Sequence, residues 1–488
     1  MKKYIKSLLL AVAVVSGMTS CESFLDTDID GSVDIENGLT SVDRIEVALN
    51  GTYNALSSHK FGGNYAVAIG DIAGDLVKSN FSTGHFSSIA TYNIQDTDGY
   101  LADIWAEGYS IIDNASRIII AGEKMLESTP DSEKPVLTTY IAEAHALRAL
   151  AYLYLSNCFA LPYKVDNGTD NSESLGLVVV KTPVQPGQEV HRSTVAQTYN
   201  AIFEDLNRAI NDFEKAGSDR GFEFMNLAAA QALYARASLY VQDYDNAAKF
   251  AKLAVDNSGT SVITDGVKYK TQYTELAVAG KETIFNIHVD SQNNLTANSP
   301  GTLWTDYGIM PSLEYGKLLG ENDIRKFLMD REPNAKKEIS IGGKYMGLNG
   351  NPAVSSQRLV GAPEMYLIIA EANLKSASPN LEVAKAALLK VAARNNDIKS
   401  AEDLPSAKEE LVKFVEDERA RELVQEGHRF QDCRRWGKMI NVYYLGDDLG
   451  YKHKDFDVAK FVYPIPNDEM SAAAGVEQNE GWENNLPK

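Results

Sequence analysis

The densest run of charge in the chain, residues 416–438, also carries apolar residues at helical spacing. On such a helix Glu418 and Arg421 stand three positions apart, and so do Arg419 and Glu422. Oppositely charged side chains at this spacing can neutralise one another. The apolar residues around them indicate that charge enters the packed side of the helix, where an unpaired group would cost several kcal/mol. The pattern therefore predicts buried ion pairs.

A second charged cluster follows Gly427, a residue type that commonly ends helices. Its members are Arg429, Asp432, Arg434, Arg435 and Trp436. An aspartate can accept a forked bond from an arginine, and an indole ring can cover the pair. We interpret this cluster, together with Glu418 and Arg421, as a structural motif around which other helices pack. The alternative is a charged helix whose side chains are solvated.

The sequence lacks the common signatures of catalytic and cofactor sites. HExxH, P-loop, GxGxxG and GxSxG patterns are all missing, and no two of the seven histidines have metal-ligand spacing. Carboxylates are abundant, but a catalytic pair of acids cannot be recognised without its geometry. We expect a protein that is not an enzyme, with no catalytic residue, no metal and no cofactor.

Composition narrows the possible partners. The 488 residues, of which 44% are hydrophobic, can bury a large core. The formal net charge of −20 makes a surface that repels nucleic acid, so nucleic-acid binding is excluded. Three cysteines are too few for a disulfide framework. Cys158 and Cys433 fall in helical patterns and are predicted to be buried free thiols.

The N-terminus has the pattern of an export signal. Lysines precede an unbroken apolar run of eight residues, and residues 1–20 end directly before Cys21. This arrangement resembles a bacterial lipobox and predicts a lipoprotein signal peptide with lipidation at Cys21. Residues 21–40 are acidic and predict a lipidated flexible tether. The alternative is ordinary signal cleavage with an incidental cysteine.

Alanine-rich helical segments indicate a scaffold of paired helices. Residues 226–241 and 244–256, joined by two residues, form a tetratricopeptide-type pair, and residues 381–393 belong to another. Residues 281–289 predict a strand. The expected fold class is mainly α, with tetratricopeptide-like helix pairs as scaffold, loop-rich segments and a few short β-strands.

Two long segments without clear periodicity, residues 59–99 and 290–351, are the candidates for function, because long irregular segments in compact proteins commonly bind ligands. Sugar recognition needs flat aromatic rings for apolar sugar faces and carboxylate or amide groups for hydroxyls. The candidate ligand-binding residues are Asp71, Asp75, Lys78, Tyr92, Trp304 and Tyr307. The alternative for Trp304 is that it packs a long loop against the scaffold.

The stretch ERARELVQEGHRFQDCRRWG closely resembles the C-terminal signature of the SusD/RagB family of nutrient-binding outer-membrane lipoproteins. Stretches near residues 41–56, 142–163 and 361–377 and the closing YPIP element are similar to the same family. The resemblance implies one SusD-like domain over residues 41–488, with an N-terminal part at about 41–270 and a C-terminal part at about 271–488.

The resemblance also implies a function and a partner. It implies a lipid-anchored protein of the outer membrane at the cell surface. Such a protein captures a glycan or oligosaccharide and delivers it to a SusC-like TonB-dependent outer-membrane transporter. Two alternatives remain open: a peptide-binding member of the same family, and a lipid-anchored glycoside hydrolase.

Overall fold

The protein is mainly helical, which confirms the predicted fold class. The computed structural model describes residues 38–80, 83–185, 187–275, 280–335, 338–443, 450–472 and 475–487. Cys21, the export signal and most of the predicted tether lie outside these residues. Within the described part of the chain, no helix is long and apolar enough to cross a membrane.

The elements follow one another along the chain as a long series of helices with short strands between some of them. In the first half they are α3 (Val42–Ser57), α4 (Tyr65–Ile72), β1 (Val77–Ser79), α5 (Ser87–Thr91), α6 (Gly99–Leu126), α7 (Lys134–Phe159), α8 (Val195–Ala216), α9 (Leu227–Tyr240) and α10 (Tyr244–Ser258). In the second half they are α11 (Gly266–Thr271), β2 (Thr283–Ile287), α13 (Pro300–Trp304), β3 (Ile309–Pro311), α14 (Leu313–Leu318), η2 (Ile324–Met329), η3 (Gly343–Tyr345), β4 (Gln357–Gly361), α15 (Ala362–Lys375), α16 (Leu381–Ala392), α17 (Lys408–Leu423), α18 (Arg429–Trp436), β5 (Met439–Tyr443), β6 (Tyr451–Asp457), η6 (Val458–Lys460) and α19 (Asn467–Ala472).

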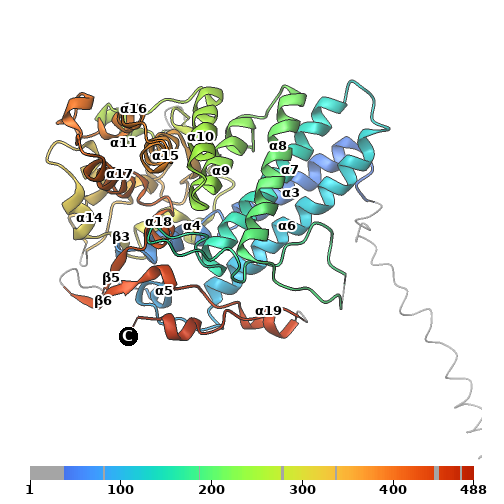
Figure 1. Cartoon of the computed structure of the whole chain (residues 1–488). Helices are drawn as coiled ribbons and strands as arrows, with labels where there is room; N and C mark the ends of the chain where they lie inside the picture. Colours follow the sequence, from blue (N-terminus) through green and yellow to red (C-terminus); the bar gives the residue numbers. More distant parts are fainter. Residues whose placement is uncertain are drawn as a thin grey trace, which may run out of the picture.

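The long helices form a row in which each packs against the next. The order of contact is α3, α6, α7, α8, α9, α10 and α15, and α15 in turn contacts α16 and α17 (Figure 1). In the view of Figure 1 the row runs from α3 and α6 on one side to α16 and α17 on the other, with α18 between them. One hydrophobic cluster, from Ile45 to Trp482, runs through the whole row.

The predicted helix pair at residues 226–256 is confirmed as α9 and α10. The Asn226 side chain accepts a hydrogen bond from the Ala229 amide and caps α9. Buried alanines on both helices let the two backbones approach closely, and the rings of Tyr234 and Phe250 stack 4.0 Å apart between them. Residues 381–393 likewise form α16, which packs on α15.

Among the residues that the structure describes, the strands form three separate antiparallel pairs, β1–β3, β2–β4 and β5–β6. The strand predicted at residues 281–289 is confirmed as β2. The pairing of β1 with β3 places Lys78 opposite Met310. This pair therefore joins the two segments that were singled out from the sequence as candidates for function.

Residues 59–99 are more regular than their sequence pattern indicates. They contain α4, β1 and α5, which corrects the expectation of one long irregular segment. Seven of the eight residues of α4 are buried, and only Tyr65 is half-exposed. A helix that is enclosed on almost every side shows no amphipathic period in its sequence.

Candidate functional site

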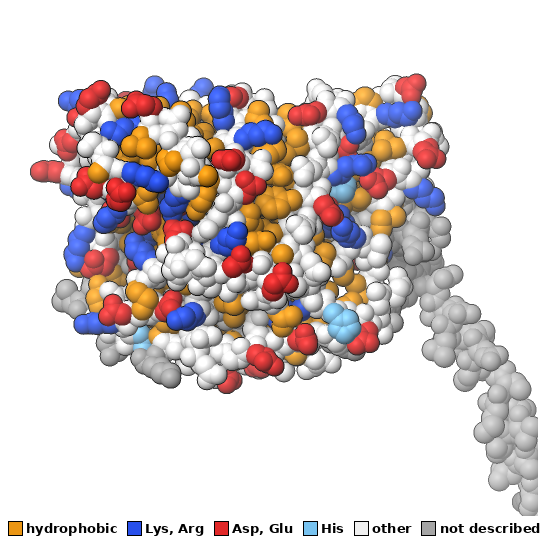
Figure 2. Space-filling model, in the orientation of Figure 1, with side chains coloured by type: hydrophobic (Ala, Val, Ile, Leu, Met, Phe, Trp, Pro, Cys, Tyr) orange, Lys and Arg blue, Asp and Glu red, His pale blue; other side chains and the backbone are white. Residues whose placement is uncertain are grey.

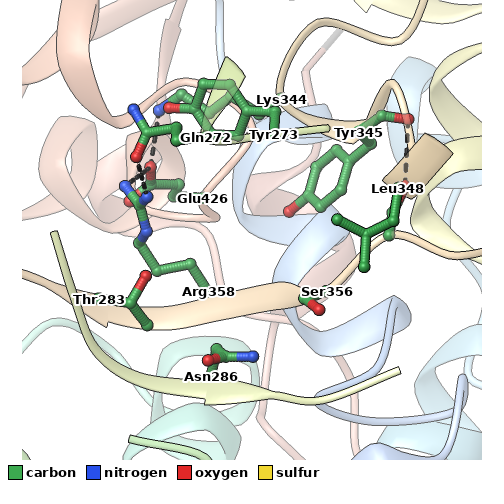
Figure 3. Close-up of a pocket in the computed structure, with 11 residues that line it drawn as sticks. Gln272, Tyr273, Thr283, Asn286, Lys344, Tyr345, Leu348, Ser356, Arg358 and Glu426 are labelled. Atoms are coloured by element: carbon green, nitrogen blue, oxygen red, sulfur yellow. Dashed lines mark hydrogen bonds and ion pairs between the residues drawn. The ribbon is translucent and has the colours of Figure 1, made fainter. Parts of the chain in front are cut away.

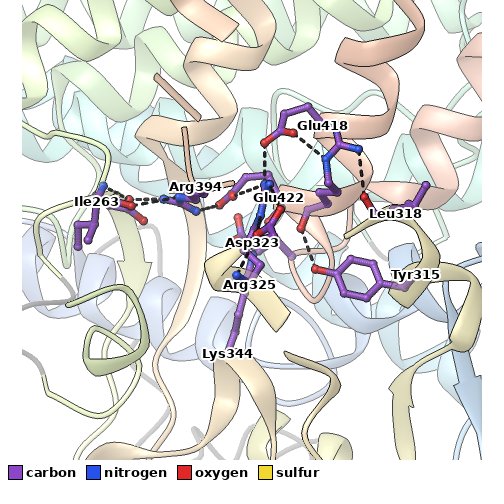
Figure 4. Close-up of polar contacts among 12 residues, drawn as sticks. Ile263, Tyr315, Leu318, Asp323, Arg325, Lys344, Arg394, Glu418 and Glu422 are labelled. Carbon is purple, nitrogen blue, oxygen red and sulfur yellow. Dashed lines mark hydrogen bonds and ion pairs between the residues drawn. The ribbon is translucent and has the colours of Figure 1, made fainter. Parts of the chain in front are cut away.

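The C-terminal motif lies inside the protein and forms a network of buried ion pairs (Figure 4). Arg325 is fully buried and contacts Asp323 at 2.7 Å, Glu418 at 2.7 Å and Glu422 at 3.3 Å. Glu422 also contacts Arg394, which in turn binds Glu282. Through Arg325 this network joins α17 to a segment 93 residues earlier in the sequence, and through Arg394 it extends to Glu282, 112 residues before Arg394.

The local pairs predicted on α17 are only partly present. Arg421 donates to Glu418 at 2.7 Å across the expected three positions. The pair of Arg419 with Glu422 does not form, because each side chain has buried partners on other elements. Arg419 donates instead to both carboxylate oxygens of Asp432 on α18, at 2.9 Å and 3.1 Å.

Asp432 and Glu371 both bind Arg435 of α18. Arg435 donates two bonds to Glu371, at 2.6 Å and 2.7 Å, and one to Asp432 at 2.9 Å. The indole nitrogen of Trp436 also donates to Glu371, at 2.9 Å. Burial by itself would raise the pKa of Glu371, but Arg435 and Lys375 hold that pKa well below its ordinary value. The carboxylate is therefore charged and fully partnered.

Two of the predicted ligand-binding residues belong to this framework. The Asp71 carboxylate accepts the Gly427 amide at 2.7 Å, and Asp75 accepts a forked bond from Arg429 at 2.6 Å and 3.0 Å. Asp71 is only 1% exposed, and burial raises its pKa to about 7. The structure corrects the expectation that these carboxylates face a ligand: both face the turn and helix of the C-terminal motif.

Three more of the predicted residues are also buried. Lys78 binds Glu338 at 2.7 Å, and Tyr92 packs edge-on against Phe456 and Phe461. Trp304 is 2% exposed and stacks on Tyr345 in the core, which corrects the expectation of an open ring. Trp304 ends α13 and belongs to the hydrophobic core cluster, so the structure agrees with the alternative that this residue packs its loop against the scaffold.

Tyr307 is the predicted aromatic residue that stays half-exposed, and the structure places it in a group of aromatic rings. Its ring stacks on that of His85, with centroids 3.8 Å apart and planes 11° apart. Gly308 has a positive φ of 74° and lies so close to Asn80 that an added Cβ would be 1.9 Å from the Asn80 amide oxygen. This glycine therefore lets the loop that carries Tyr307 rest against the end of β1.

The other rings of the group come from α4, α6 and the turn before α4. Tyr65 packs edge-on against both His59 and Tyr100, at 5.2 Å and 4.9 Å. Burial raises the pKa of both Tyr65 and Tyr100, and the nearby Tyr307 makes a smaller contribution to each shift. All five rings are half-exposed, and we name them the aromatic patch: His59, Tyr65, His85, Tyr100 and Tyr307.

Polar groups lie beside these rings. Lys60 and Asp103 form an ion pair at 3.0 Å, and the pKa of Tyr65 is raised to about 12, first by burial and then by Tyr100 and Asp103. The Tyr65 phenol therefore keeps its proton at neutral pH and can donate a hydrogen bond. Rings that offer a flat face, next to a carboxylate, an ammonium group and phenols, have the chemistry that sugar binding requires.

Sequence reasoning identified one of the five patch residues. Tyr65 and Tyr100 stand at the first turns of α4 and α6, and the Asp98 side chain caps α6 just before Tyr100. An aromatic residue at the start of a helix that follows a loop is the signal that could have identified them.

The charges on the face shown in Figure 2 are interspersed, with acidic and basic side chains side by side over most of the helices.

The comparisons with known proteins agree with this architecture. The model of the SusD family matches residues 362–482, and a second family model, described as starch-binding and associating with the outer membrane, matches residues 23–239. A SusD-like protein of Formosa agariphila is 23% identical, over 91% of this chain and 93% of its own. A SusD-like protein of Bacteroides ovatus is 26% identical, over 55% of this chain and 48% of its own.

Solved structures show the same fold. A SusD superfamily protein from Bacteroides vulgatus is 27% identical, with a TM-score of 0.79 over 91% of this chain and 99% of its own. Over most of its length the chain is therefore similar to proteins of the SusD family, and one of the two matching models is described as starch-binding and associating with the outer membrane. Members of this family generally bind their ligands without catalysing a reaction.

Proposed function

We propose that the protein binds a glycan or oligosaccharide through the aromatic patch and delivers it to a SusC-like TonB-dependent outer-membrane transporter. The observation that carries the binding proposal is the parallel stack of His85 and Tyr307, half-exposed beside Tyr65 and Tyr100. Stacked rings in the core need no explanation, but rings that stay half-exposed next to polar groups suit an amphipathic ligand. The carbohydrate-binding character of the family supports the same ligand class.

Removal of one ring from the patch tests this proposal. We expect Tyr307→Ala to lower the affinity for the bound glycan about fivefold or more, which corresponds to about 1 kcal/mol for one stacking ring. The measurement is calorimetry with glycans identified on an array that also carries peptides. The matched control is Tyr234→Ala, because Tyr234 is also half-exposed and stacked, on Phe250 between α9 and α10.

The same array and titration separate the alternatives. Peptide binding without glycan binding would replace the carbohydrate ligand with a peptide. Release of shortened sugars from a bound glycan would identify a glycoside hydrolase. Equal glycan affinity of the wild type and the Tyr307→Ala variant, with Tyr234→Ala also unchanged, would move the binding site away from the aromatic patch.

Delivery to a transporter is the second part of the proposal. We propose that Cys21 carries lipid and that residues 21–40 act as a tether, because six acidic residues and no basic residue lie between Glu22 and Thr40. A coil of about twenty residues reaches about 25 Å on average, which would keep the protein at a high effective concentration near a membrane partner. Copurification of a β-barrel transporter from detergent-solubilised membranes is the expected result. Recovery of this protein alone, with uptake unaffected by its deletion, would leave a surface binder without a transport role.

A further inference from the structure

A polar cavity lies between the β2–β4 pair and the loop that carries Tyr345 and Leu348 (Figure 3). It holds about 40 Å³ of free space and shares no residue with the aromatic patch. Figure 3 shows Gln272 and Arg358 on one side of the hollow, Tyr345 and Leu348 on the other, and Asn286 and Ser356 between them. The cross-strand pairing of Asn286 with Arg358 brings these two residues to the same position along the sheet.

Several polar atoms around this cavity are buried and have no hydrogen-bond partner among the residues that the structure describes. They are the Gln272 side-chain nitrogen, the Tyr273 hydroxyl, both polar atoms of the Asn286 amide and the Ser356 hydroxyl. Asn286 is 4% exposed and Gln272 is 2% exposed. A buried polar group left without a partner is costly, and buried polar atoms in proteins are almost always satisfied. A concentration of such atoms around one hollow therefore points to a bound group that supplies the missing partners.

The charged side chains that line the cavity already bind one another. Lys344 donates to Glu426 at 2.7 Å, and Arg358 donates to the Gln272 side-chain oxygen at 2.6 Å. Arg358 also lies 3.8 Å from Glu426. A bound ion would have to compete with these pairs, whereas the unpartnered atoms are all neutral amides and hydroxyls. A ligand that satisfies these atoms is therefore expected to be neutral.

The donors and acceptors define the ligand further. The Gln272 nitrogen can only donate, the Asn286 amide offers both a donor and an acceptor, and the two hydroxyls can do either. Neighbouring hydroxyls on a carbon chain match this mixture, because each hydroxyl both donates and accepts. The free space corresponds to about three water molecules, so it admits two neighbouring hydroxyls while the rest of the ligand extends into the part of the hollow that is open to solvent. Leu348 supplies an apolar wall for carbon-bound hydrogens. We propose that this cavity binds a vicinal diol, either in a free polyol such as glycerol or at the end of a sugar chain.

The test uses glycerol as the probe and full-length mature protein. We expect saturation-transfer NMR to detect glycerol binding to the wild type. Each of Tyr273→Phe and Ser356→Ala removes one hydroxyl and should lower the glycerol affinity about two- to tenfold. The control is Tyr451→Phe, which removes the phenol hydroxyl of a half-exposed tyrosine outside the cavity. In the wild type, the side-chain NH₂ resonances of Asn286 and Gln272 should shift with glycerol, which keeps the test informative if a variant folds poorly.

Three results would overturn the inference. One is unchanged glycerol affinity in both cavity variants, and another is no shift of the Asn286 and Gln272 resonances in the wild type. The third is tighter binding of acetamide than of glycerol, which would replace the diol with an amide. An oligosaccharide with a diol at its end distinguishes a free polyol from a sugar-chain end as the ligand. Tighter binding of the oligosaccharide than of glycerol at the cavity would identify the sugar-chain end as the ligand.

The inference is independent of the aromatic patch, and one variant shows this. Tyr307→Ala should leave glycerol binding at the cavity unchanged while it weakens glycan binding at the patch. If Tyr307→Ala abolished glycerol binding as well, the diol would bind at the aromatic patch. That result would refute diol binding at the cavity and leave the proposed function standing.

Discussion

Removal of Arg435 should destabilise the protein without affecting ligand binding. In Arg435→Ala the carboxylate of Glu371 loses two hydrogen bonds and Asp432 loses one, and all three residues are buried. Removal of one partner from a buried ion pair costs about 3–5 kcal/mol, because it leaves an uncompensated charge. In this variant Glu371 still contacts Lys375 at 2.9 Å and accepts the hydrogen bond of the Trp436 indole. We therefore expect the free energy of unfolding to fall by about 4 kcal/mol, near the middle of that range.

Thermal unfolding converts this free energy into a measurable shift. The entropy of unfolding is about 2.1 cal/mol/K per residue, or about 1 kcal/mol/K for a chain of 488 residues. The expected fall in Tm is therefore about 4 °C for Arg435→Ala. The control is Lys413→Ala, which breaks an exposed pair with Asp417 and should change Tm by less than about 1 °C.

Two further measurements make the reasoning refutable. Arg435→Ala combined with Glu371→Gln should recover part of the lost stability, because the second change removes the stranded charge. Glycan affinity of the folded fraction of Arg435→Ala should equal that of the wild type. A variant that melts like the wild type but binds no ligand would show that Arg435 belongs to a binding site and not to the structural framework.

Three other outcomes follow from buried or modified residues. Trp304→Ala should lower the free energy of unfolding by about 3–5 kcal/mol, as measured by denaturant titration, because it empties a buried ring site; unchanged stability would contradict its placement in the core. The pKa of Asp71 is raised to about 7, so its contribution to stability is present below about pH 4 and is lost as the pH rises to about 7. Relative to Asp71→Asn, the wild type should therefore lose stability between pH 4 and pH 7.5, and parallel stability curves would refute the raised pKa. Mass spectrometry of the mature N-terminus should show acylated Cys21, and Cys21→Ala should release the protein from membranes; an unmodified cysteine would end this hypothesis.

Local sequence patterns were enough to identify the helical scaffold. The alanine-rich pair predicted at residues 226–256 forms α9 and α10, and both Cys158 and Cys433 are buried free thiols, as predicted. These features depend on residues within a few positions of each other, where helix periodicity and capping rules apply. The motif around α17 and α18 also identified the family, because its charged residues occur at specific short spacings.

What the tertiary structure decided was the partner of each charged or aromatic side chain. Arg325 meets Glu418 across 93 residues, and Asp75 meets Arg429 across 354. No local pattern predicts such contacts, because they depend on how distant elements pack. The same reason explains the candidate site. A tryptophan in a long loop looked available but lies in the core, whereas His85 and Tyr307 meet only because β1 pairs with β3 and brings their two segments together. The sequence by itself determined the helices, the motif and the family, and the packing of distant segments determined which side chains face a ligand.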